Sequence, residues 1–123
     1  MGAAFGSARR LSLGVIGAGG RGTYVTTEFQ KDAGLRVGSI CDVYEPNLER
    51  APGLVRKGQS EAARAMRRYQ EVLADRTIDA VLIATPEYWR HRMVLDALAA
   101  GKDVYVEHGR RMRWDATAQK EVA

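Results

Sequence analysis

A glycine-rich run between two regular segments is the first feature of this sequence with a clear chemical use. Residues 17–22 read GAGGRG, follow the apolar residues 13–16 and precede a helix-like segment. A G-x-G-x-x-G turn between a strand and a helix is typical of sites that bind the pyrophosphate of a dinucleotide. The alternative interpretation is a plain glycine turn in an unrelated α/β protein.

Each glycine of the run has an expected task. Gly17 permits the tight turn out of the strand, Gly19 removes a side chain where the pyrophosphate must come close, and Gly22 lets the helix pack near the strand. The free N–H groups at the helix start, including those of Gly20 and Arg21, are expected to point at the phosphates.

Asp42 closes the next apolar stretch, 20 residues after Gly22. An acid at this distance is expected to accept hydrogen bonds from the ribose hydroxyls, and its charge repels a 2′-phosphate, so NAD is favoured over NADP. No arginine follows immediately to reverse this preference, although Arg50 could swing in. The alternative is an aspartate that only caps a helix or fixes a loop.

The apolar run 79–84 is followed by Thr85, Pro86 and the aromatic pair Tyr88 and Trp89. Proline ends the strand, because it cannot donate to the ladder. The two rings either pack beside a nicotinamide or form the first core turn of the next helix. The sequence leaves both interpretations open.

A further strand end carries the candidate for proton transfer. The run 103–107 ends in Glu107, and His108 follows it. An imidazole titrates near neutral pH and serves as a general base, so His108 is the candidate catalytic residue. His91 is expected to be an exposed helix residue. Two histidines without further ligands at metal spacing do not indicate a metal site.

Strand and helix patterns alternate along the whole chain. This alternation predicts an α/β fold, a doubly wound parallel sheet of about five strands, with ligands at the carboxyl ends of the strands. Residues 1–10 are expected to form a loose leader and residues 11–123 one domain. Strands are expected at 11–16, 35–41, near 65, at 79–84 and 103–107, and helices at 21–32, 46–51, from Pro52-Gly53 to 64, and at 71–74, 88–100 and 114–122.

Composition excludes several classes of protein. The chain has 123 residues, a net charge of +4 and one cysteine, Cys41, which rules out an intramolecular disulfide. Cys41 lies in an apolar run and is expected to be a buried thiol rather than a nucleophile. No apolar run approaches the ~18 residues that span a bilayer. The basic residues lack interleaved aromatics, so we do not expect nucleic acid as a partner. Because the apolar runs are too short to span a bilayer or to form a signal segment, we expect no membrane partner and a cytoplasmic location.

Four phrases of the sequence together resemble the N-terminal domain of the Gfo/Idh/MocA family. They are GVIGAGGRG, CDVYEPNLERA, IDAVLIATPEYW and LDALAAGKDVYVE, and the resemblance runs from residue 13 almost to the end. It implies an NAD(P)-dependent oxidoreductase, or the smaller group of NAD-dependent glycosidases. It also implies a Rossmann domain followed by a second α/β domain that holds the substrate. The cofactor residues that it implies are Gly17, Gly19, Gly22, Asp42, Thr85, Pro86 and Glu107.

Two of the departures from the family bear directly on its function. The family commonly writes Glu-Lys-Pro where this chain has Glu107-His108-Gly109, and the chain stops where the second domain would begin. We therefore expect a truncated Rossmann domain without its substrate domain. If active, it passes hydride between the nicotinamide and a sugar or polyol hydroxyl, with His108 taking the proton. The alternatives are a non-catalytic nucleotide-binding module that pairs with another chain and a fragment of an NAD-dependent glycoside hydrolase.

Overall fold

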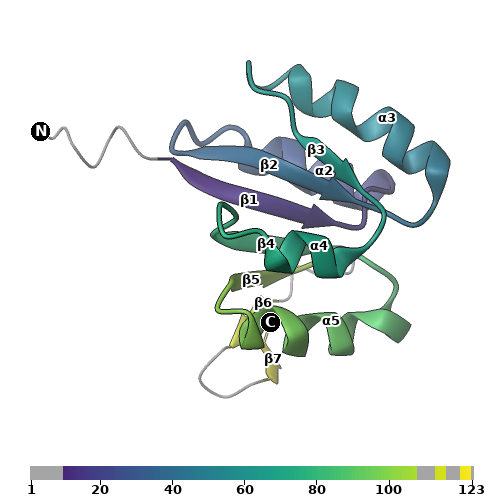
Figure 1. Ribbon diagram of the computed structural model, residues 1–123, viewed down its shortest axis with the longest axis vertical. Helices are drawn as coiled ribbons and strands as arrows, with labels where there is room; N and C mark the ends of the chain where they lie inside the picture. Colours follow the sequence, from purple (N-terminus) through teal and green to yellow (C-terminus); the bar gives the residue numbers. More distant parts are fainter. Residues whose placement is uncertain (1–9, 108–112, 116–119, 123) are drawn as a thin grey trace, which may run out of the picture.

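The centre of the molecule is one parallel β-sheet. The computed structural model describes residues 10–107, 113–115 and 120–122. The sheet consists of β1 (Leu11–Ile16), β2 (Leu35–Cys41), β3 (Arg64–Met66), β4 (Ala80–Ile83) and β5 (Asp103–Val106). Its order is β3-β2-β1-β4-β5, with every pair parallel, so the first strand of the chain lies in the middle (Figure 1). The predicted five-stranded α/β fold is confirmed.

Helices cover both faces of this sheet. They are α2 (Gly20–Phe29), α3 (Glu45–Arg56), α4 (Tyr69–Ala74) and α5 (Glu87–Ala99). In Figure 1, α2 lies behind the sheet and α4 in front of it. Successive strand residues point to opposite faces, so each strand feeds two cores. Val15 packs with α2 and α3 in one core cluster, and Ile16 packs with α4 and α5 in the other.

Helix α3 runs through Pro52, where the sequence predicted that the helix ends or kinks, and the predicted end is wrong. The helix is continuous from Glu45 to Arg56 with Pro52 inside it. Proline removes one backbone hydrogen bond there. The apolar face outweighs this loss, because Leu48, Ala51 and Val55 are all buried on the same side of the helix, before and after the proline.

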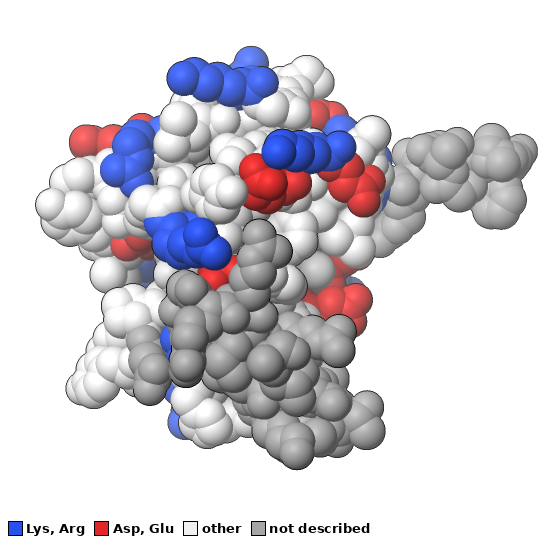
Figure 2. Space-filling model, turned by 180° about the vertical axis from the view of Figure 1, so that it is seen from behind, with Lys and Arg blue, Asp and Glu red and all other residues white. Residues whose placement is uncertain are grey.

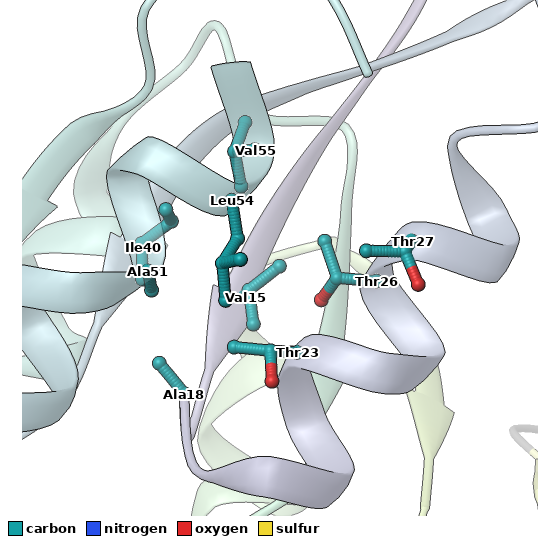
Figure 3. A pocket seen from close by; sticks show the side chains of 9 residues that line it. All are labelled: Val15, Ala18, Thr23, Thr26, Thr27, Ile40, Ala51, Leu54 and Val55. Atoms are coloured by element: carbon teal, nitrogen blue, oxygen red, sulfur yellow. The ribbon is translucent and has the colours of Figure 1, made fainter. Parts of the chain in front are cut away.

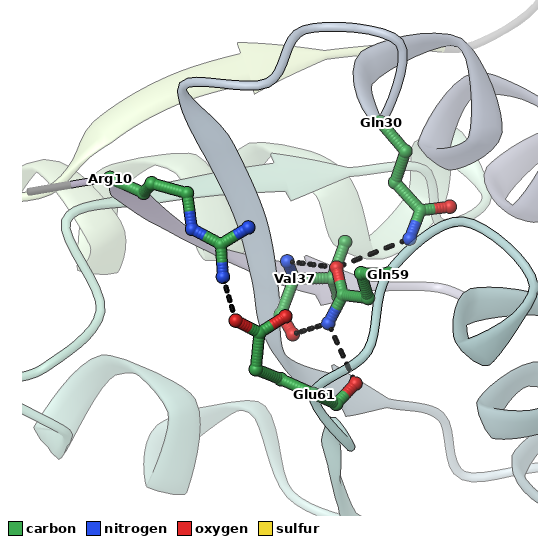
Figure 4. A network of polar contacts seen from close by, with 5 residues as sticks. All are labelled: Arg10, Gln30, Val37, Gln59 and Glu61. Atoms are coloured by element: carbon green, nitrogen blue, oxygen red, sulfur yellow. Dashed lines mark hydrogen bonds and ion pairs between the residues drawn. The ribbon is translucent and has the colours of Figure 1, made fainter. Parts of the chain in front are cut away.

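The predicted helix between Pro52 and residue 64 is wrong beyond Arg56, because the chain binds the sheet edge there instead. The side-chain amide of Gln59 accepts from the Val37 N–H at 2.8 Å and donates to the Val37 carbonyl at 2.9 Å. Gln30 donates to Gln59, and Glu61 pairs with Arg10 (Figure 4). Gln59 thus acts as a strand partner to β2 just before β3 begins, and a helical backbone here would forfeit these bonds.

The predicted helix at 114–122 is also wrong. The backbone forms an antiparallel pair, β6 (Arg113–Asp115) and β7 (Lys120–Val122), in which Trp114 lies opposite Glu121. Ala, Lys and Glu are good helix formers, but helix propensity amounts to less than about 1 kcal/mol per residue and is readily overridden by tertiary context. The other boundaries lie within a few residues of the predicted ones. No second domain occurs among the described residues, and none of the helices there has the length and apolarity to cross a bilayer.

Lys102 is a buried cation that sequence reasoning did not single out. Its ammonium donates to the backbone carbonyls of Asp75 at 2.8 Å and Ile78 at 2.6 Å, which ties the start of β5 to the loop before β4. We expect Lys102→Met to lower the free energy of unfolding by about 2 kcal/mol, because both carbonyls lose a charged donor. Urea titration measures this change.

Lys31→Met is the matched control for that substitution. Lys31 lies just after the end of α2, is exposed and forms a surface ion pair with Glu28. Such surface pairs contribute less than about 1 kcal/mol. Equal stability of the Lys102→Met variant and the parent chain would contradict the proposed role of the Lys102 ammonium.

Candidate functional site

The candidate site lies at the carboxyl ends of the parallel strands. The first residue after each of four strands, Gly17, Asp42, Ala84 or Glu107, donates its backbone N–H to the last residue of the neighbouring strand. These four bonds measure 2.8 to 3.2 Å and join all five strands in one row. The row continues the ladder one residue beyond the strands, so the backbone floor of the site is fixed before any ligand arrives.

Two glycines of the GAGGRG turn are required by its geometry. Gly17 has φ +100°, and a Cβ there would lie 2.7 Å from the Ala84 carbonyl oxygen. A Cβ on Gly22 would lie 2.1 Å from the carbonyl oxygen of Gly17. A side chain at either position therefore collides with backbone, and the turn can form only with glycine at both.

The other two glycines face open space. A Cβ on Gly20 would meet no atom within 4 Å, and one on Gly19 would have only the Asn47 amide, at 3.7 Å. Gly19 caps α2 without a side-chain hydrogen bond, and the first turn of the helix has no acidic residue. The first N–H groups of a helix lack intrahelical acceptors and carry its positive end. This open cradle fits a diphosphate.

Asp42 is held by three donors of the protein itself. Its Oδ2 accepts from the Ala18 N–H at 2.8 Å and the Asn47 amide at 3.0 Å, and its Oδ1 accepts from the Tyr44 N–H at 2.9 Å. Arg50 Nη2 donates to the Ala18 carbonyl at 2.9 Å and to Asn47 Oδ1 at 3.3 Å. Ala18, Asp42, Asn47 and Arg50 thus form a closed ring, here called the Asp42 ring, between the glycine turn and α3.

The loop-fixing role of Asp42, one of the two interpretations of the sequence, is therefore present, and the ribose contact stays a prediction. Sequence reasoning missed Asn47 entirely. The available signal was its spacing of three from Arg50, which places both side chains on one face of α3.

The aromatic pair stands outside the core. Tyr88 is 84% exposed and Trp89 is 56% exposed, and their rings meet edge to face at 5.0 Å. The interpretation of these rings as a core turn is wrong, and their contact with a nicotinamide stays a prediction. Pro86 is the N-cap of α5, and the Thr85 hydroxyl donates to the Met93 sulfur at 3.4 Å. His91 is exposed, as predicted.

Glu107 is a buried carboxylate beside the glycine turn. It is 2% exposed, and its Oε1 lies 3.4 Å from Arg21 Nη2. The guanidinium of Arg21 also lies 5.3 Å from the centre of the Tyr24 ring. Arg21 therefore connects the start of α2 to the end of β5 across the site. His108, the candidate base, lies outside the described residues.

The lone thiol is buried next to this site, as predicted. Burial, and after it the charges of Asp42 and Glu71, raise the pKa of Cys41 from its ordinary 9.0 to about 12. A thiol with this pKa has about one thiolate in ten thousand at pH 8. We expect no reaction of the native chain with Ellman's reagent at pH 8 and full reaction in urea.

The same shift makes a contribution to stability that depends on pH. Because the folded pKa lies above the unfolded one, the contribution is complete below pH 9 and is lost as the pH rises from 9 towards 12. Cys41→Ala lacks this component of the pH profile. Rapid labelling of the folded chain at pH 8 would contradict the assignment.

A small gap lies between α2, α3 and the sheet, and Ala18 of the glycine turn forms part of its wall (Figure 3). Its wall is mainly apolar, and the hydroxyls of Thr23 and Thr26 donate to carbonyls of their own helix at 2.9 and 2.7 Å. It offers no polar group that would orient a ligand, and we interpret it as a packing gap. Figure 2 shows the molecule from behind the view of Figure 1, and over the described part of this face Lys and Arg are separated by Asp, Glu and uncharged residues.

A doubly wound parallel sheet with a glycine turn and an uncapped helix start at its strand ends defines a dinucleotide-binding Rossmann domain. Comparison with known families gives the finer assignment. The chain belongs to the Gfo/Idh/MocA oxidoreductases, since the model of this family, "Oxidoreductase family, NAD-binding Rossmann fold", matches residues 11–112.

Three known proteins illustrate the similarity. "Glycosyl hydrolase family 109 protein 2" of Shewanella sp. (strain ANA-3) is 34% identical over 99 residues, 77% of this chain and 22% of its own. The crystal structure of an NAD-binding protein from Listeria innocua has a TM-score of 0.69 and 34% identity, over 82% of this chain and 27% of that one. GenD2 from gentamicin A biosynthesis, in complex with NAD, has a TM-score of 0.66 and 29% identity, over 81% and 27%. The chain thus spans about a quarter of the length of each.

Proposed function

We propose that this chain binds NAD across the carboxyl ends of β1, β2, β4 and β5. The observation that carries the proposal is the open cradle at Gly19 and Gly20 in front of the uncapped start of α2. Bare backbone N–H groups hold the pyrophosphate there, and Asp42 faces the adenosine ribose. The carboxylate disfavours a 2′-phosphate, so NAD is preferred over NADP. The NAD complex of GenD2 supports binding of this dinucleotide.

The reaction proposed for this site is hydride transfer with a sugar or polyol hydroxyl. The bound nicotinamide supplies the hydride acceptor. His108 takes the hydroxyl proton, because it follows the strand end that carries Glu107, and an imidazole is a base at neutral pH. Glu107, paired with Arg21, orients His108 or the nicotinamide ribose. Thr85, Pro86 and Tyr88 border the nicotinamide side, and a cytoplasmic location, where NAD is abundant, suits this function.

Titration of the chain with NADH, followed by calorimetry, tests cofactor binding. We expect saturable binding in the micromolar to millimolar range, and no heat at millimolar NADH would overturn the proposal. Assays of NAD reduction against a panel of sugars and polyols then separate an active site from a non-catalytic module that pairs with another chain.

NAD-dependent glycoside hydrolysis is a second candidate function. It is favoured by the name of the Shewanella relative at 34% identity. Release of an aryl group from aryl glycosides only when NAD is present would distinguish this reaction from net oxidation of the sugar.

A further inference from the structure

The inference concerns the cofactor preference and starts from the acceptor capacity of Asp42. A carboxylate has about four lone-pair positions. In this chain Ala18, Asn47 and Tyr44 already donate to three of them, two at Oδ2 and one at Oδ1. Strict preference for NAD rests on a carboxylate that accepts from the ribose hydroxyls. Asp42 retains one acceptor position for the ribose hydroxyls. It therefore binds the ribose more weakly than an aspartate that accepts no hydrogen bonds from the protein.

The second observation is a cation in the same ring. Arg50 is exposed, and its two hydrogen bonds both start from Nη2, to Ala18 and to Asn47. Among the described residues no partner is recorded for its Nε and Nη1 groups, so these donors are available to a ligand. The side chain of Asn47 bridges the two charged groups, because its amide donates to the Asp42 carboxylate and its Oδ1 accepts from the Arg50 guanidinium. A guanidinium is well suited to bind phosphate oxygens in pairs.

We propose that Arg50 is a specificity-determining residue, which binds the 2′-phosphate of NADP and so limits the preference of this site for NAD. The proposal rests on the proposed function, because it places the adenosine ribose at Asp42. The chain then binds both dinucleotides, with NAD favoured only modestly, and the Asp42 ring sets the ratio of the two affinities.

The test compares Arg50→Gln with Arg56→Gln. Glutamine at 50 keeps an amide donor for the Ala18 carbonyl and removes the charge. Arg56 lies in the last turn of the same helix, so its variant removes an equal charge away from the ring. We expect Arg50→Gln to raise the Kd of NADP at least tenfold, because charge-assisted bonds to the phosphate are lost, and to change the Kd of NAD less than threefold. Arg56→Gln changes both less than threefold.

Adenosine 2′,5′-bisphosphate and AMP provide a readout without the nicotinamide half. In Arg50→Gln, the affinity for the bisphosphate relative to AMP is expected to fall. The affinity for NADP relative to NAD is expected to fall by the same factor. An equal loss for NAD and NADP would overturn the inference and assign Arg50 to holding the glycine turn, and an unchanged NADP affinity would overturn it too. Failure of the parent chain to bind either dinucleotide would overturn the proposed function and this inference together, whereas NAD binding with an unaffected ratio overturns only the inference.

Discussion

Gly22→Ala is expected to destabilise the fold by about 3 kcal/mol or more, because the added methyl group enters space occupied by backbone. Its Cβ would lie 2.1 Å from the Gly17 carbonyl oxygen and 3.3 Å from the Ala84 Cβ. Neither neighbour is the end of a flexible side chain, so α2 as a whole must shift away from the sheet. Urea unfolding measures the loss of free energy, and thermal unfolding is expected to show a decrease in Tm of roughly 10 °C.

Gly20→Ala is the control for this prediction. It makes the same chemical change two residues earlier, where a Cβ meets no atom within 4 Å. We expect its stability to lie within about 1 kcal/mol of the parent chain, because alanine favours helix over glycine. Similar stabilities for the two variants would show that the turn is not packed as described.

Gly19→Ala is expected to abolish useful cofactor binding without unfolding the chain. Gly19 has φ −74° and ψ −170°, which alanine adopts freely, and its Cβ would meet only the Asn47 amide at 3.7 Å. The methyl group does fill the space proposed for the pyrophosphate. Loss of two charge-assisted hydrogen bonds corresponds to an increase of about 100-fold or more in the Kd for NADH.

Calorimetric titration and thermal unfolding of the same sample separate the two effects of Gly19→Ala. Gly53→Ala is the matched control, because a Cβ there has no atom within 4 Å and Gly53 lies in α3, away from the proposed pyrophosphate position. That variant binds NADH normally and gains roughly 0.5–1 kcal/mol of stability. NADH affinity that survives in Gly19→Ala would place the pyrophosphate elsewhere.

The sheet could be predicted from the sequence because its strands are short apolar runs with clear ends. Ala80 to Ile83 are all buried, and such a run has few alternatives to a central parallel strand. Gly17 and Gly22 could be predicted as well, since a strand, a tight turn and a helix in close contact leave room for no other residue. These features follow from local pattern and backbone sterics.

The errors occurred where distant contacts decide the local structure. Pro52 is tolerated because residues of α3 on both sides of it are buried against the sheet. Gln59 stays out of a helix because it pairs with Val37, 22 residues earlier. The three donors to Asp42 come from the turn before α2, from the loop after β2 and from α3. Sequence spacing alone therefore could not show that the carboxylate already accepts three hydrogen bonds. Both Gln59 and Asp42 bind groups whose positions only the complete fold defines.

The central place of β1 has a consequence for synthesis of the chain. One edge of β1 pairs with β2, but the other pairs with β4. Leu13, for example, can pair with Ala80 only after residue 80 has been made. Until residue 83 has left the ribosome, Leu11–Ile16 presents an unsatisfied edge of amides and carbonyls next to apolar side chains. Such edges are the surfaces through which nascent chains associate with one another. Strand β1 therefore gains its second partner only after about 70 further residues have been made.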